Sequence, residues 1–271
     1  MEVRSFILSA QSMSLCVSKE IKEMGEGELA GAVGVDRNLE NLTVGNAQAV
    51  TYYVMKELVD IGERTRDIIH SFKRNDAKVR KEISSKYGKR RSTRTKQYLN
   101  LISKKVVQDA KANKQAIVFE DITRINRLYR RGNGQSRSYR FMMNSWPFYE
   151  IKRQIEYKAA WEGVQVITLT KGETRGTTMD CPRCGERLQV PVRGDEEHYR
   201  QLWCEVCRKW TARDVVAVLN ISRRGRLRFD RSERKEGGAE EAVKGNAGHD
   251  GEPLILRVDA SKLRQSKQQT Q

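Results

Sequence analysis

The chain has 271 residues, 38% hydrophobic and 32% charged, and its 52 Lys and Arg outnumber its 35 Asp and Glu to give a formal net charge of +17. Nucleic acid is the partner that best balances so large an excess, although a basic surface that only serves solubility is an alternative. No window reaches the roughly 18 apolar residues of a membrane span, and the N-terminus lacks the basic segment of a signal peptide, so we expect a cytoplasmic protein without membrane contact.

Apolar patterning predicts strands and helices that alternate along the chain. Strand-like runs occupy parts of 1–30 and then 32–36, 42–54, 116–122 and 164–169, and helical spacing occurs over 53–86, 92–113, 145–163 and 211–227. We expect Gly88 to interrupt the helical region and Thr211 to cap the last helix. This alternation is typical of an α/β domain with a mixed sheet.

Four of the five cysteines form two Cys-x-x-Cys pairs, Cys181 with Cys184 and Cys204 with Cys207, and nineteen residues separate the pairs. Each pair aims two thiolates at one point, and four thiolates bind Zn²⁺ or iron in a closed tetrahedral site. The set predicts structural zinc, because a thioredoxin-like redox role would need only one pair. Cys16 lies in a strand-like region and is expected to be a small buried residue.

Three carboxylates stand at distinctive positions. Asp36 ends the apolar run AVGVD, Glu120 ends the run AIVFE, and Asp214 lies in the first turn of the helix that follows the cysteines. A carboxylate at the end of a buried strand is costly unless it is paired or binds a metal ion. Three that converge at one sheet edge would suit two Mg²⁺ ions and phosphodiester hydrolysis, whereas carboxylates that merely cap the next turn are the alternative.

The motifs GVDRNLENLTV, IVFEDITR, CPRCG with CEVC, and ARDVVAVLNI resemble, in this order, the RuvC motifs and zinc ribbon of the insertion-sequence TnpB/OrfB family. The segment NSWPFYEIKRQIEYKAAWEG before the ribbon is also similar, so the resemblance covers roughly residues 31–224. It implies an RNase H-like (RuvC-like) fold with an inserted zinc ribbon. The implied function is that of a transposon-associated, RNA-guided DNA endonuclease, related to the ancestors of type V CRISPR effectors.

The resemblance also assigns roles to individual residues. It makes Asp36, Glu120 and Asp214 the catalytic ligands of two Mg²⁺ ions. Asn41 matches the Asn that usually follows the first Asp. Asp121 would support Glu120 without touching the metal.

The chain departs from the family pattern at two positions near these carboxylates. Asn38 stands where the family usually has Gly, and Val216 stands in place of an Asn that would bring a polar group near the metals. Family members also carry an N-terminal β-barrel and a helical lobe that grip guide RNA and target duplex. Residues 1–30 would correspond to the last strands of that portion.

The expected organisation follows from these motifs. It comprises a remnant of the N-terminal β region (1–30), a RuvC-like core with the first two motifs (31–176), the zinc ribbon (177–210), the third-motif helix (211–227) and a mostly disordered tail (228–271). The tail is charged, rich in Gly and poor in aromatic residues. Its apolar segment PLILRV (253–258) would either dock or stay loose.

Two basic segments, 73–96 and 124–140, hold much of the positive excess. Their Lys and Arg would bind phosphates independently of base sequence, and tyrosines in the second segment would stack on bases. A solvated helix face is the alternative for the first segment. The candidate nucleic-acid contacts are Arg124, Arg127, Tyr129, Arg130, Arg131 and Arg137.

Three functions therefore compete. A metal-dependent endonuclease that binds DNA and a guide RNA is favoured by the three carboxylates. A catalytically silent, nucleic-acid-binding remnant is favoured if the N-terminal lobes are absent. A zinc-ribbon regulatory module explains the cysteines and the charge but leaves the carboxylates unexplained. The sequence does not predict an oligomeric state.

Overall fold

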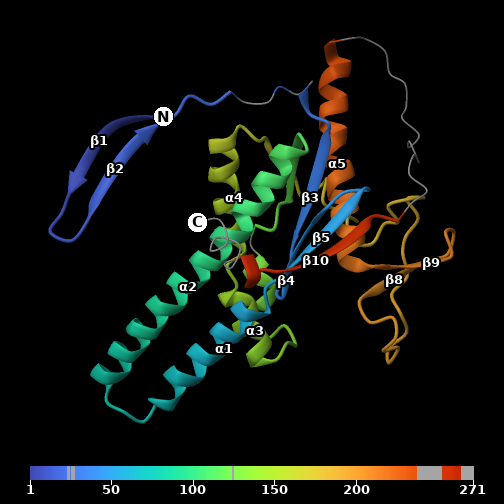
Figure 1. Cartoon of the computed structure of the whole chain (residues 1–271). Coiled ribbons are helices and arrows are strands. Elements are labelled where there is room, and N and C mark those ends of the chain that lie inside the picture. Colours follow the sequence, from blue (N-terminus) through green and yellow to red (C-terminus); the bar gives the residue numbers. More distant parts are fainter. Residues whose placement is uncertain (23–24, 26–27, 124, 237–251, 264–271) are drawn as a thin grey trace.

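The computed structural model describes residues 1–22, 25, 28–123, 125–236 and 252–263 (Figure 1). The strands are β1 (Glu2–Leu8), β2 (Met13–Ser18), β3 (Gly31–Arg37), β4 (Asn41–Gly45), β5 (Ala49–Val54), β6 (Gln115–Glu120), β7 (Val166–Leu169), β8 (Gln201–Cys204), β9 (Lys209–Ala212) and β10 (Leu254–Asp259). The α-helices are α1 (Lys56–Ser71), α2 (Ala77–Ala112), α3 (Arg137–Ser145), α4 (Phe148–Glu162) and α5 (Arg213–Glu236), and a 3₁₀ helix spans Ile125–Tyr129.

A six-stranded mixed sheet forms the centre of the molecule, in the order β10-β5-β4-β3-β6-β7. The meander β3-β4-β5 is antiparallel, whereas β6 and β7 continue the sheet parallel to β3. The parallel strands are joined by helical crossovers: α1 and α2 connect β5 to β6, which pairs with β3, and α3 and α4 connect β6 to its neighbour β7. The predicted α/β class with a mixed sheet is confirmed.

Helices cover both faces of this sheet (Figure 1). On one face, Val33 and Val35 of β3 join a core with α2 and α4. On the other face, Ala32 of β3 packs with Ala217 and Ile221 of α5. Successive residues of a strand point to opposite faces, so the apolar run of β3 serves both layers.

The helical hairpin of α1 and α2 differs from the prediction in one respect. Gly88 does not interrupt the helix, because α2 continues through it, and the break falls instead before Asp76, whose side chain accepts a hydrogen bond from the Val79 N–H at 2.9 Å. A helical Gly costs only about 1 kcal/mol relative to Ala, too little to end a long helix. The helix predicted over 145–163 is confirmed as α4, which ends at Gly163 in the left-handed conformation.

The C-terminal region also differs from expectation. The last helix starts at Arg213, since Thr211 belongs to β9, and it continues to Glu236 rather than 227. Within the expected disordered tail, β10 pairs in parallel with β5, and Ala260 after it is fully buried. The open edge of β5 offers unpaired backbone groups that an apolar segment such as PLILRV can satisfy. Residues 237–251 and 264–271 of the tail lie outside the described residues.

The N-terminal hairpin β1–β2 stands apart from the sheet (Figure 1). Most of its apolar side chains are exposed, Phe6 at 63% and Leu8 at 66% for example. Cys16 of β2 is exposed, so the expectation that it is a buried residue is wrong. Among the described residues, no helix is both long and apolar enough to cross a membrane.

Candidate metal centres

Two strands bring carboxylates to the same edge of the sheet. Asp36 is the penultimate residue of β3, and Glu120 is the last residue of β6. These strands are parallel neighbours in which Val35 lies opposite Phe119, so the next residues, Asp36 and Glu120, reach the same level. The alternation of side chains places both on the face that α5 covers.

The third carboxylate comes from the start of α5. Asp214 is the second residue of this helix and is 9% exposed. The Ser222 hydroxyl, two turns farther along, donates to the Ala32 carbonyl at 2.7 Å near the beginning of β3. The helix therefore runs antiparallel to β3 and brings its N-terminal end to the strand end that holds Asp36.

Close packing fixes this register of α5. A Cβ atom on Gly34 would lie 2.3 Å from the Val218 carbonyl oxygen, and one on Gly225 would lie 2.3 Å from a methyl group of Val118. Both glycines thus permit the approach of helix and sheet, and a side chain at either position would displace α5.

The electrostatics show an accumulation of negative charge. The pKa of Asp36 is raised to about 7, first by burial, then by the neighbouring Asp214 and to a smaller extent by Glu120, against a hydrogen bond of 2.8 Å from the Asn38 amide that lowers it. Burial likewise raises the pKa of Glu120, partly offset by the Thr177 hydroxyl and the Arg37 guanidinium. The protein's own cations therefore do not neutralise this cluster.

Polar side chains surround the carboxylates. The Asn41 amide donates to Asp214 at 3.4 Å and the Arg200 guanidinium contacts the other oxygen of Asp214, also at 3.4 Å. Arg37 donates to the Glu120 carbonyl at 2.7 Å. Asp121, expected to support Glu120, instead accepts from the Thr123 N–H at 2.8 Å and caps the turn after β6.

The four paired cysteines form the second centre. Their sulfur atoms all lie within 4.8 Å of one another, so they are positioned to bind one metal ion. Cys181 and Cys184 sit in a turn, Cys204 ends β8, and Cys207 lies in the turn between β8 and β9. In the described part of the chain no other group of three or more His, Cys, Asp or Glu meets the same distance criterion, so the three carboxylates are spread more widely.

The cysteine-bearing segment packs directly on α5. Leu188 and Leu202, both at most 4% exposed, join Cys181 and Cys204 in a small core with Val216. Val216 is fully buried there. The residue that replaces the family's Asn therefore packs against the cysteine-bearing segment and does not line the carboxylates.

The chain is similar to known proteins. The family described as "Cas12f1-like, TNB domain" matches residues 148–221. A TnpB-like protein of Methanocaldococcus jannaschii is 30% identical over 196 residues, which are 69% of this chain and 66% of that protein. The chain belongs to the TnpB-like family.

Two solved structures show the same fold at low sequence identity. The Cas12f1–sgRNA–target DNA complex matches with a TM-score of 0.50 and 17% identity, over 80% of this chain and 55% of that chain. The CRISPR-Cas12f ternary complex matches with a TM-score of 0.53 and 18% identity, over 78% and 41%. This TnpB-like chain thus spans about two thirds of its relative from M. jannaschii and about half of the Cas12f chains. The RuvC-like fold predicted from the motifs is confirmed.

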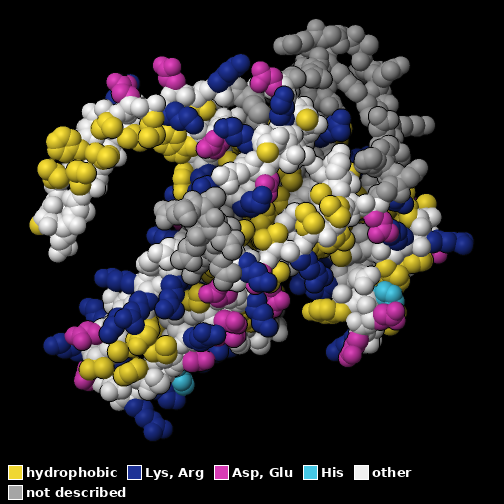
Figure 2. Space-filling view, in the orientation of Figure 1, with side chains coloured by type: hydrophobic (Ala, Val, Ile, Leu, Met, Phe, Trp, Pro, Cys, Tyr) yellow, Lys and Arg dark blue, Asp and Glu magenta, His cyan; other side chains and the backbone are white. Residues whose placement is uncertain are grey.

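The predicted nucleic-acid contacts of this TnpB-like chain lie around the 3₁₀ helix and α3. Arg127, Arg130, Arg131 and Arg137 are exposed, whereas Arg124 lies outside the described residues. The Tyr129 ring meets the Tyr139 ring edge-on at 5.8 Å. These contacts stay a prediction. Figure 2 shows further Lys and Arg side chains gathered over α1 and α2.

Sequence reasoning missed three residues next to the carboxylates of this TnpB-like chain. Arg200 contacts Asp214, Thr177 contacts Glu120, and Asn220 donates to the Thr177 carbonyl at 2.8 Å. Asn220 belongs to the third motif, but the sequence did not indicate that it bonds to the Thr177 carbonyl. Neither Arg200 nor Thr177 stands in a pattern that distinguishes it from other residues of the cysteine-bearing region.

Proposed function

We propose that this TnpB-like chain is a metal-dependent DNA endonuclease whose catalytic residues are Asp36, Glu120 and Asp214. The observation that carries the proposal is the convergence of these three carboxylates from β3, β6 and α5 at one sheet edge, where the pKa of Asp36 is raised to about 7. Buried carboxylates that lie close together remain ionised only if cations bind to them.

The donor set fits Mg²⁺. Carboxylate oxygens are the ligands that this ion prefers, and three carboxylates that converge at one sheet edge would suit a pair of ions about 3.5–4 Å apart that share bridging oxygens. Bound there, Mg²⁺ would activate water and stabilise the leaving oxygen of a phosphodiester.

The chain's own side chains prepare this chemistry. Asn38 and Asn41 hold oxygens of Asp36 and Asp214 in place. Arg200 contacts Asp214 at the rim of the site and would also be placed to bind a substrate phosphate, since a guanidinium pairs with either group. The Asp36 and Glu120 side chains are partly enclosed between sheet and α5, which limits competing contact with bulk water.

The four cysteines would hold structural Zn²⁺, which leaves no open position for catalysis. DNA would be the substrate, and the net charge of +17 supports a polyanionic partner. A guide RNA is proposed from the relationship to the Cas12f1–sgRNA–target DNA complex. The division into a nuclease core (31–176 with 211–227) and a zinc ribbon (177–210) is proposed on the same basis.

A direct test incubates the purified protein with end-labelled single-stranded DNA, with and without Mg²⁺, beside the Asp36→Ala variant. We expect Mg²⁺-dependent cleavage that the variant loses. Cleavage that persists in the variant would exclude the proposed site. Binding without cleavage by the wild-type protein would instead support the silent nucleic-acid-binding function, and sequencing of any copurified RNA would test guide binding.

A further inference from the structure

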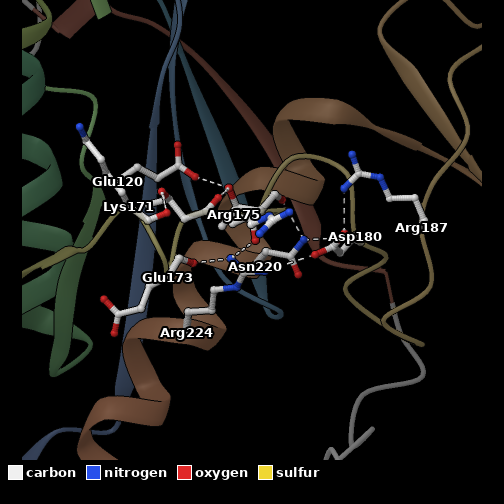
Figure 3. Close-up of polar contacts among 10 residues, drawn as sticks. Glu120, Lys171, Glu173, Arg175, Asp180, Arg187, Asn220 and Arg224 are labelled. Atoms are coloured by element: carbon white, nitrogen blue, oxygen red, sulfur yellow. Dashed lines mark hydrogen bonds and ion pairs between the residues drawn. The ribbon is translucent and has the colours of Figure 1, made fainter. Parts of the chain in front are cut away.

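The segment that enters the cysteine-bearing region, residues 170–180, is fastened to α5 by polar contacts (Figure 3). Arg228 pairs with Glu173 in two hydrogen bonds, and Arg224 donates to the backbone carbonyls of Glu173 and Arg175. Asn220, one turn nearer the carboxylates, donates to the backbone of the same segment. These contacts give the segment one position relative to the helix.

Thr177 is the point at which this segment meets Glu120. Its side-chain hydroxyl donates to Oε1 of Glu120, and the residue is 2% exposed. The same hydroxyl lies 2.9 Å from the Thr174 carbonyl, but a hydroxyl has one proton and a carboxylate is the stronger acceptor. The contact therefore holds one oxygen of Glu120 and leaves the other available.

Asn220 fixes the backbone on which Thr177 stands. Its amide donates to the Thr177 carbonyl at 2.8 Å and to the Asp180 carbonyl at 2.7 Å, so both of its protons are used. Asn220 is 5% exposed, and a side chain without these donors would leave two carbonyls of the segment without this partner.

We propose that Thr177 and Asn220 are positioning residues of the nuclease site. Asn220 sets the segment on α5, and Thr177, carried by the segment, orients Glu120 toward the metal ions. This inference rests on the proposed function. It also connects the two metal centres, because Cys181 follows the same segment directly, so the cysteine-bearing region braces Glu120 as well as Asp214.

The orientation matters because a glutamate side chain at a strand end has several rotamers, and ordering it costs conformational entropy. A neighbour that orders a metal ligand in advance typically changes metal affinity or activity by about 10- to 100-fold. Loss of Thr177 should thus weaken Mg²⁺ binding without removing a ligand.

The test compares Thr177→Val, which removes the hydroxyl at nearly constant volume, with Thr177→Ser, which keeps it. Asn220→Ala provides a second variant, Asp36→Ala shows the loss of a ligand, and Ser222→Ala serves as a matched control on the same helix. Mg²⁺ affinity is measured by titration calorimetry on each zinc-loaded protein, together with zinc content, melting temperature and the Mg²⁺ concentration for half-maximal cleavage.

We expect Thr177→Val and Asn220→Ala to weaken Mg²⁺ binding by about tenfold at unchanged zinc content, with Thr177→Ser close to wild type. Ser222→Ala should lower the melting temperature without changing Mg²⁺ affinity. If Asp36→Ala loses Mg²⁺ but Thr177→Val and Asn220→Ala bind it as wild type does, the positioning role is wrong and the proposed function stands. If the wild-type protein itself fails to bind Mg²⁺, both are wrong.

Discussion

On one face of the sheet Val35 and Phe119 pack against the large apolar side chains of α2 and α4, whereas on the other face Gly34 and Val118 lie directly beneath α5. The first face resembles an ordinary hydrophobic core, in which the loss of stability on truncating a side chain grows with the volume removed. On the second face the backbone of α5 packs very close to the backbone of β3, and the three carboxylates lie at the edge of this face. The face that contributes most apolar side chains is thus separate from the face that sets the geometry of the site.

This difference predicts that substitutions on the α5 face change cleavage, whereas substitutions on the other face change mainly stability. On the α5 face, a change that improves stability can abolish function, because the carboxylates there are held at a cost in stability. Away from that face, stability should change without effect on cleavage by the folded protein.

The largest effect is expected for Asp36→Asn. Removal of a metal ligand should lower cleavage by about a thousandfold or more, since the metal ions supply several kcal/mol of transition-state stabilisation. In magnesium-free buffer the same variant should be more stable than wild type at pH 8, on the order of 2 kcal/mol, because Asn carries no buried charge.

The sign of this pH dependence follows from the raised pKa of Asp36, about 7 in the folded protein against 3.8 ordinarily. The folded state holds the Asp36 proton more tightly than the unfolded state does, so the contribution of Asp36 to stability is lost as the pH rises from about 4 to about 7. Thermal unfolding of both proteins at pH 5 and pH 8 measures the difference. Equal melting-temperature gaps at the two pH values would contradict the assigned burial of Asp36.

A smaller effect on cleavage is expected for Gly34→Ala. Its new methyl group would meet the Val218 carbonyl at 2.3 Å, and because that contact is with backbone, α5 must shift and carry Asp214 away from Asp36. Such overpacking costs about 1–3 kcal/mol, and a misplacement of about 1 Å can cost about 100-fold in rate. Cleavage and chemical denaturation measure both. A wild-type rate in the folded variant would show that the register of α5 is not critical.

Much of this arrangement could be predicted from the sequence. The apolar runs that end in Asp36 and Glu120 indicated buried strands, and the order of the motifs around the cysteine pairs indicated the RuvC-like fold. The close approach of α5 to the sheet could not be predicted, because it depends on which residues meet across the two layers: Gly34 lies against the α5 backbone at Val218, and Gly225 lies against Val118. Pattern within one segment carries no information about such a contact.

The remaining differences have the same physical origin. Thr177 looks like any polar loop residue until Asn220, far along the chain, fixes it beside Glu120. The segment PLILRV becomes β10 because β5 presents an open edge, a property of the assembled sheet rather than of the tail. Cys16 is exposed because the hairpin that contains it lacks a covering layer among the described residues. Each of these features depends on tertiary contacts between segments that are far apart in the sequence.

The smallest effect is expected for Gly88→Ala, the matched control for Gly34→Ala. Gly88 lies within α2 and no atom comes within 4 Å of a Cβ built on it, so alanine fits without a clash. Because Ala has the higher helix propensity and restricts the unfolded chain, the variant should gain about 0.5–1 kcal/mol in stability. Its cleavage rate should equal that of wild type, since α2 lies on the opposite face from the carboxylates. A change in rate at unchanged fold would mean that α2 contributes to the site, for example by holding substrate along its basic surface, and would remove the contrast between the two faces.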